Sequence, residues 1–184
     1  MGGVFISIYC SRQRDLKVLI AFSSVVHISL GIVGILTQTF WGFSGFVLLI
    51  VAHGFISPLL FFLINFFYDS NHSRSIFILK GSILLNPLFC LFWFFSCFLN
   101  IGLPPFISFY SEALIVRSLR FLSYYEWFFL FLILFFTGVY CVLIYSHLSH
   151  GSFSNRTHIP FLIPQPFFFF IIIFYVILYP LDFF

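Results

Sequence analysis

Residues 41–68 read WGFSGFVLLIVAHGFISPLLFFLINFFY, a run that contains no Asp, Glu, Lys or Arg. A helix of about 20 apolar residues crosses the hydrocarbon core of a bilayer, which is roughly 30 Å thick. Lipid offers no hydrogen-bond partner, so a helix is favoured because it satisfies its backbone groups internally. The run therefore predicts a membrane-spanning helix.

The composition of the whole chain supports the same class of protein. Hydrophobic residues make up 62% of the 184 and charged residues only 7%, and the mean hydropathy is +1.15. Soluble domains carry roughly 25% charged residues, so the soluble class is excluded. The net charge of +3 is too small and too scattered for a nucleic-acid surface.

Outside that run, further apolar stretches bounded by polar loops predict a polytopic, all-α bundle. We expect a single membrane domain over 1–184, with the end of one helix at 1–10 and spanning helices at about 16–36, 41–68, 84–122, 127–148 and 161–181. The first stretch is too short to span, and we interpret it as the end of a helix whose beginning is absent.

The element at 84–122 is expected to be broken, because Gly102-Leu103-Pro104-Pro105 interrupts it. Two adjacent prolines remove two backbone donors and clash with the preceding helical turn. The backbone groups freed at such a break are tolerated in a membrane only where they face protein or a wet cavity.

Basic residues gather in alternate loops. Six of the eight lie in the loops at 11–17, 69–83 and 148–160, namely Arg12, Arg14, Lys17, Arg74, Lys80 and Arg156. The positive-inside rule places these loops on the cytosol-equivalent side, which is the matrix for a mitochondrial protein. This assignment requires that the broken element crosses the membrane once.

Three ionisable groups are expected well inside the membrane, where such groups are costly and therefore indicate function. They are His27, His53 and Glu112. Ser24 shares a helix face with His27, Ser57 with His53 and Ser108 with Glu112, since each pair is three or four residues apart. We treat these serines as supporting polar groups.

Each group also has a plainer interpretation. His27 could be a neutral, hydrogen-bonded packing residue, and this alternative stays open. His53 is a better functional candidate, because Pro58 leaves the carbonyl of Gly54 free. Glu112 is the best, since a carboxyl gains nothing by packing there. Lys17 could serve as an interfacial anchor whose ammonium reaches the membrane surface.

No cofactor or metal site is predicted. The sequence contains no glycine-rich phosphate loop and no Ser-His-Asp set, and the cysteines have no His or carboxylate at ligand spacing. Cys10, Cys90, Cys97 and Cys141 are interpreted as small buried hydrophobes. The 33 phenylalanines are typical of a T-rich organellar genome, in which Phe and Leu codons replace one another, and this indicates a mitochondrion.

Three runs follow one another along the chain. The first is RQRDLK at 12–17 with LIAFSSVVH at 19–27, the second is AHG at 52–54 with HSRS at 72–75, and the third is NIGLPP at 100–105 with Ser111-Glu112. In this order they resemble the chain 4 family of mitochondrial NADH:ubiquinone oxidoreductase (complex I), whose members are antiporter-like subunits. The resemblance covers about residues 5–120. Ser111 stands where the family usually has glycine.

The resemblance implies the second half of a fourteen-helix, antiporter-like fold built from two inverted repeats. In that family a histidine that matches His53 passes protons to a glutamate that matches Glu112. His27 corresponds to a further histidine on the hydrated axis. Lys17 matches a motif residue that is not one of the proton-carrying lysines.

The resulting hypothesis is the C-terminal fragment of a split, proton-translocating complex I subunit that has no redox site of its own. Its expected partners are the N-terminal half as a separate chain, neighbouring antiporter-like subunits and membrane lipid, in the mitochondrial inner membrane. The alternatives are a subunit of a standalone cation/proton antiporter, or a structural remnant that completes the membrane arm.

Overall fold

The computed structural model describes residues 1–81, 87–104, 106–119 and 124–151. Within these ranges every regular element is an α-helix, which confirms the all-α class. The helices are α1 (Gly2–Cys10), α2 (Leu16–Leu36), α3 (Phe40–Asn71), α4 (Pro87–Ile101), α5 (Ile107–Ser118) and α6 (Tyr124–Ser149). The helix expected at 161–181 lies outside the described residues.

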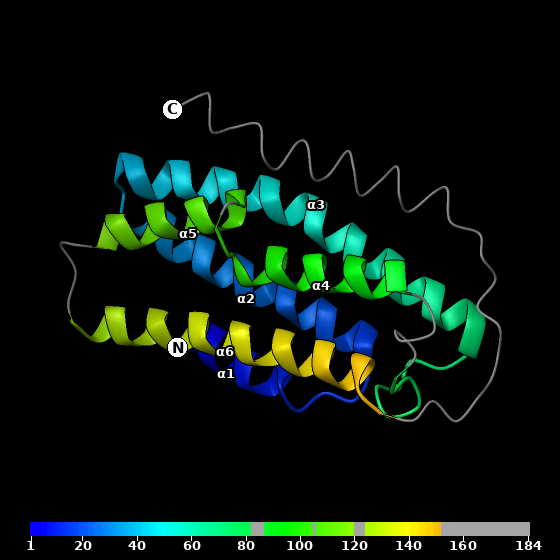
Figure 1. The fold of residues 1–184 in the computed structure, drawn as a ribbon. Helices are drawn as coiled ribbons and strands as arrows, with labels where there is room; N and C mark the ends of the chain where they lie inside the picture. The colour runs from blue at the N-terminus through cyan, green and yellow to red at the C-terminus, as the bar shows by residue number, and fades with distance from the viewer. Residues whose placement is uncertain (82–86, 105, 120–123, 152–184) are drawn as a thin grey trace.

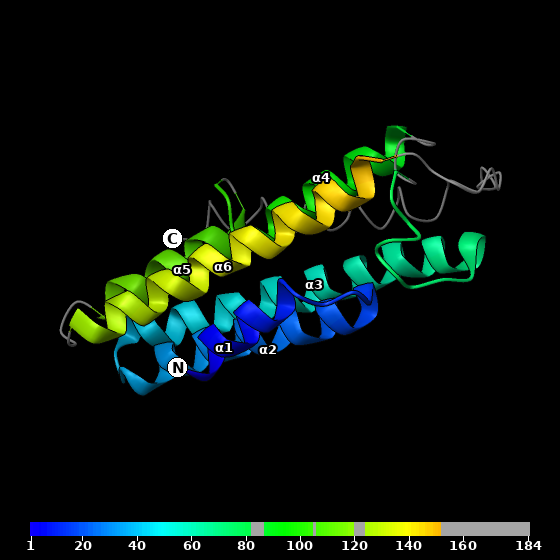
Figure 2. The same cartoon turned by 90° about the horizontal axis from the view of Figure 1, so that it is seen from below.

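The helices form two layers. Figure 2 shows α1, α2 and α3 in one layer and α4, α5 and α6 in the other. Helix α3 packs on α2 and α5, while α6 packs on α1 and α4. Figure 1 shows the helices running nearly parallel to a common axis, with α4 giving way to α5 partway along the bundle and the other connections at its two ends.

Three helices in the described part of the chain are long and apolar enough to cross a membrane, namely α2, most of α3, and α6. Less than half of each apolar window is buried within the protein, at 44%, 39% and 33% respectively. The remaining surface carries large apolar side chains such as Ile32, Val47 and Phe131. Lipid is the solvent that such a surface requires.

The turn between α2 and α3 depends on small residues. The Thr39 hydroxyl caps α3 by accepting a hydrogen bond from the Gly42 amide at 3.1 Å. A Cβ added to Gly34 would lie 3.0 Å from the Gly42 carbonyl oxygen, and one added to Gly42 would overlap the Gly34 carbonyl oxygen. The absence of side chains at these two positions lets the helix backbones approach closely.

The expected Pro-Pro break is confirmed between α4 and α5. Gly102 has φ +74°, a left-handed conformation that glycine adopts without the usual steric cost. The Leu103 amide donates to the Phe98 carbonyl at 3.3 Å, and the Ser108 hydroxyl donates to the Leu99 carbonyl at 2.9 Å. These bonds satisfy carbonyl groups at the end of α4, and α5 continues in the same general direction (Figure 1).

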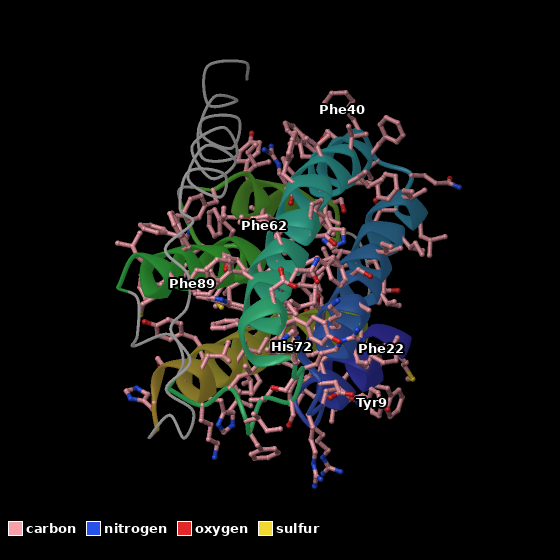
Figure 3. All side chains as sticks on the ribbon, turned by 90° about the vertical axis from the view of Figure 1, so that its right-hand side faces the viewer. Tyr9, Phe22, Phe40, Phe62, His72 and Phe89 are labelled. Atoms are coloured by element: carbon pink, nitrogen blue, oxygen red, sulfur yellow. The ribbon has the colours of Figure 1, made fainter. Side chains whose placement is uncertain are left out.

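The loops at 11–15 and 72–80 lie together at one end of the bundle, which Figure 3 views along the helix axes with His72 near the viewer. The Ile76 amide donates to the Arg14 carbonyl at 2.9 Å, and the Leu16 amide donates to the Arg74 carbonyl at 3.1 Å. Five basic side chains are thereby gathered at this end, which we call the basic end. Four belong to the two segments, Arg12, Arg14, Arg74 and Lys80, and the fifth is Lys17 in the first turn of α2.

Aromatic rings support several of these cations. Lys17 Nζ lies 5.4 Å from the centre of the Tyr68 ring, and the Arg74 guanidinium carbon lies 4.9 Å from it on the same ring. Tyr9 and Phe22 also meet at the contact between α1 and α2, with ring centres 5.2 Å apart (Figure 3). Lys17 is the second residue of α2. It thus lies at a helix end, as an interfacial anchor would, and apart from the three inner candidates.

Candidate functional site

The three inner candidates come from three helices. His27 lies on α2 and is 7% exposed, and Glu112 lies on α5 and is 9% exposed. His53 lies on α3 and is half-buried. In a membrane, polar side chains at such positions face the interior of the bundle or a water-filled cavity. His27 and Glu112 are buried in this way, while His53 contacts His27 and stays partly exposed.

The structure brings the two histidines into contact. Their ring centres are 5.4 Å apart, and the planes are tilted by 34°. The two histidines lie on the neighbouring helices α2 and α3, which form an antiparallel hairpin and pack closely at Gly34 and Gly42. Each imidazole can take up and release a proton, so the contact brings two proton-exchanging groups together inside the bundle.

Asn100 extends this pair across the second layer. The His27 Nε2 atom is 2.9 Å from the Asn100 Oδ1 atom. The Asn100 amide nitrogen donates to the Tyr140 hydroxyl oxygen at 3.5 Å and to the Cys141 sulfur at 3.2 Å. The resulting polar chain runs from His53 on α3 through α2 and α4 to Tyr140 on α6, and its last two members are buried.

The hydrogen bond with Asn100 also determines which ring nitrogen of His27 can take up a second proton. When His27 carries its proton on Nε2, it donates that proton to the Asn100 side-chain oxygen, and Nδ1 is then the nitrogen that can take up a second proton. The bonds to Tyr140 and Cys141 hold the amide in this orientation. Asn100 is therefore a positioning residue for His27.

Sequence reasoning missed this role because it considered only ionisable groups inside the membrane. Asn100 was used only as part of the NIGLPP run. The signal that could have found it is the same cost argument applied to amides, because an unpaired amide in an apolar helix is also expensive. Tyr140, in a helix rich in aromatic residues, gave no separate signal.

Glu112 lies against the break. A Cβ added to Gly102 would lie 2.7 Å and 2.8 Å from the two carboxylate oxygens. The carboxylate therefore occupies the space that any larger residue at 102 would need. The acid thus lies beside the end of α4, the helix that also carries Asn100.

Two of the three supporting serines donate to backbone carbonyls and not to the candidates. Ser24 donates to the Ala21 carbonyl at 2.6 Å, and Ser108 donates to Leu99 across the break. Ser57 is half-buried on α3. A serine hydroxyl that donates to backbone can still accept a hydrogen bond, from water for example. Their role beside His27, His53 and Glu112 stays a prediction.

The described residues contain no group of three His, Cys, Asp or Glu side chains that could hold a metal ion. The four cysteines are free thiols. Cys10 and Cys141 are buried, while Cys90 is half-buried and lies 3.3 Å from the Tyr145 hydroxyl. The chemistry that the described site offers is proton exchange among imidazole, carboxyl and hydroxyl groups.

Comparison with known proteins identifies relatives over most of the chain. The family described as "NADH:quinone oxidoreductase/Mrp antiporter, TM" matches residues 1–140. The protein named NADH-ubiquinone oxidoreductase chain 4 of Anopheles arabiensis is 38% identical over 86% of this chain and 72% of its own length. That of Myxine glutinosa is 40% identical over 86% of this chain and 34% of its own length.

The chain spans about a third of the length of most of these relatives, as with the protein of the same name from Lumbricus terrestris, which is 38% identical and of which 33% is covered. A solved structure of respiratory complex I from Thermus thermophilus contains a chain with a similar fold. The TM-score is 0.87 at 18% identity, over 96% of this chain and 37% of that one. The likeness confirms the antiporter-like arrangement of the helices.

Proposed function

Because this chain belongs to the NADH:quinone oxidoreductase/Mrp antiporter transmembrane family, we propose that it is a proton-translocating part of the membrane arm of a respiratory complex I. The observation that carries the proposal is the contact between His27 and His53, continued through Asn100 to the break where Glu112 lies. Ionisable groups joined in this way inside a membrane are typical of proton relays.

In the proposed route, His53 exchanges a proton with His27 or with water that reaches the α2–α3 contact. Glu112 takes up and releases the proton at the break, where freed backbone groups can hold water. The half-exposed position of His53 makes it the point of exchange with the rest of the subunit. Asn100 stays hydrogen-bonded to Nε2 of His27, so that only Nδ1 takes up and releases a proton.

The driving reaction lies elsewhere in this proposal. The chain would couple to NADH:ubiquinone oxidoreduction through its neighbours in the membrane arm, as the names of its relatives suggest. We place it in the mitochondrial inner membrane with the basic end toward the matrix. This orientation is supported by the five basic residues gathered there, since basic loops are retained on that side.

The rest of the fourteen-helix fold must supply the remainder of a proton path. We propose that a separate polypeptide, the N-terminal half of the same subunit, supplies it and packs beside α1 and α2. Chemical cross-linking of the purified assembly, followed by mass spectrometry, should identify this partner. Cross-links that connect α1 only to residues of one continuous, longer chain would exclude the split arrangement.

A standalone cation/proton antiporter remains the second candidate, because the matched family includes such transporters by its description. Purification in a mild detergent separates the two functions. We expect the chain to co-purify with NADH:ubiquinone oxidoreductase activity in one large assembly. Recovery in a complex that exchanges cations for protons without NADH oxidation would favour the antiporter instead.

A variant of Asn100 tests the polar chain. We expect Asn100→Leu to lower proton pumping per NADH oxidised, because His27 loses the partner that fixes its protonated nitrogen. Loss of a buried hydrogen bond to one remaining partner typically costs about 1–3 kcal/mol, so thermal stability should also fall. Pumping by reconstituted vesicles and its pH profile are the measurements.

Asn100→Gln and Cys141→Ser serve as the conservative controls for that experiment. Asn100→Gln keeps an amide near His27, and Cys141→Ser keeps a polar partner for Asn100. Both variants should therefore pump more protons per NADH than Asn100→Leu. A purely structural role would instead lower the stability of Asn100→Leu without moving the pH profile.

A further inference from the structure

A cavity of about 130 Å³ opens at the basic end, and of the polar chain that begins at His53 only Tyr140 reaches its lining. It lies between the end of α1, the start of α2, the loop at 72–80 and the last turns of α6. Its polar lining comes from both sides, with Arg12, Gln13 and Arg14 on one and His147 on the other. The proposed function gives this cavity no role.

The cations that line it are not neutralised by the protein. In the part of the chain that the structure describes, neither Arg12 nor Arg14 forms an ion pair with a carboxylate, and the recorded contact of Arg14 is with the Phe77 ring at 5.8 Å. Both arginines are exposed. Guanidinium groups bind phosphate and carboxylate through paired hydrogen bonds. The cavity therefore presents two cations to an anion.

The deeper wall is apolar. Leu19, Ile76 and Ile144 line it, and Tyr140, which has no exposed surface, closes the bottom. A site with cations at the level of the helix ends and apolar side chains below them matches the two parts of a membrane phospholipid. Basic pockets between transmembrane helices on this side are where anionic headgroups bind.

Two other occupants fit less well. A proton inlet is disfavoured, although Tyr140 leads to Asn100 and His27, because two guanidiniums at the mouth repel hydronium. Free inorganic phosphate would use the arginines, but it would leave the apolar wall in contact with water. We propose that the cavity binds the headgroup of an anionic phospholipid, with Arg12 and Arg14 on its phosphate and the proximal chain against Leu19 and Ile144.

Such a lipid would add a further link between elements that already touch, since the ring centres of Phe77 and His147 lie 6.4 Å apart at this end. The loop at 11–15 is bonded to the segment at 74–76, whereas α6 reaches the cavity through His147 and Ile144. A bound headgroup would link this loop pair to the end of α6. The helix that carries Tyr140 would then be held at its end by lipid.

The test uses the intact assembly that carries the chain, delipidated and reconstituted in phosphatidylcholine vesicles with increasing mole fractions of spin-labelled phosphatidylglycerol. The variant is Arg12→Gln with Arg14→Gln. The matched control is Arg74→Gln with Lys80→Gln, which removes two cations from the same end but none from the cavity lining. Electron spin resonance measures the immobilised fraction of the lipid.

We expect the first pair to weaken lipid association by roughly tenfold more than the control pair, because both pairs contribute general attraction to the surface but only Arg12 and Arg14 line the cavity and can form paired hydrogen bonds to the phosphate. The control pair should change it much less. Equal losses in both pairs would indicate only general attraction to the basic end and overturn the site. Displacement of the labelled lipid by inorganic phosphate at matched ionic strength would assign the cavity to free phosphate. Folding of both variants is checked by thermal unfolding in detergent.

Discussion

Glu112→Gln should stop proton transfer through this chain while leaving the helix bundle assembled. Glutamine has nearly the same shape as glutamate, so it fits the space beside Gly102, but it cannot take up or release a proton. Proton transfer by a positioned side chain typically contributes about 10²–10⁴-fold to the rate of the step it serves. We expect the flux carried by this chain to fall by about a hundredfold or more.

The measurement is proton uptake by vesicles containing the purified assembly, normalised to NADH oxidation. Glu126→Gln is the matched control, because Glu126 is an exposed carboxylate in the first turn of α6. Glu112→Asp should retain part of the flux, since the carboxyl remains with a shorter reach. Unchanged pumping in Glu112→Gln would instead support a structural role for the chain.

Gly102→Ala is expected to have the second largest effect, for two separate reasons. Alanine at φ +74° costs about 1–2 kcal/mol relative to an ordinary helical conformation. Its Cβ would also lie under 3 Å from the Glu112 carboxylate. The carboxylate is the end of a flexible side chain and can move aside, so the bundle should fold with Glu112 displaced.

The expected result is a pumping defect out of proportion to the loss of stability. Gly138→Ala provides the control, because nothing lies within 4 Å of a Cβ at that position of α6, and alanine favours a helix over glycine. Vesicle pumping and thermal unfolding should be measured together on both variants. If Gly102→Ala loses stability but pumps as well as the Gly138 variant, the position of Glu112 does not depend on Gly102.

Much of the fold follows from the apolar runs, because in lipid a helix is the form that satisfies its own backbone. The Pro-Pro break was equally accessible, since proline acts locally. The residues at which a helix begins and ends were harder to predict, because they depend on capping groups. Helix α3 begins at Phe40 because Thr39 caps it, and it continues to Asn71 before His72 turns left-handed.

The site was only partly accessible from the sequence. Helical spacing says which side chains share a face of one helix, but the contact between His27 and His53 depends on how two helices cross. A close approach of the two backbones at Gly34 and Gly42 accompanies that crossing, and spacing along the chain does not reveal it. The link from Asn100 to Tyr140 requires the packing of α4 against α6.

The close approach of α2 and α3 also determines which positions of the sequence tolerate substitution during evolution. Side chains on the outer surface, such as Phe43 and Phe131, are exposed, so exchanges between phenylalanine and leucine there change little beyond the contacts with lipid. A single methyl group at Gly42 would instead overlap the Gly34 backbone and push the hairpin apart. Strong codon bias can therefore change the lipid-facing side chains of this protein with little effect on its packing. At the contact between α2 and α3, by contrast, Gly34 and Gly42 leave no space for a larger residue.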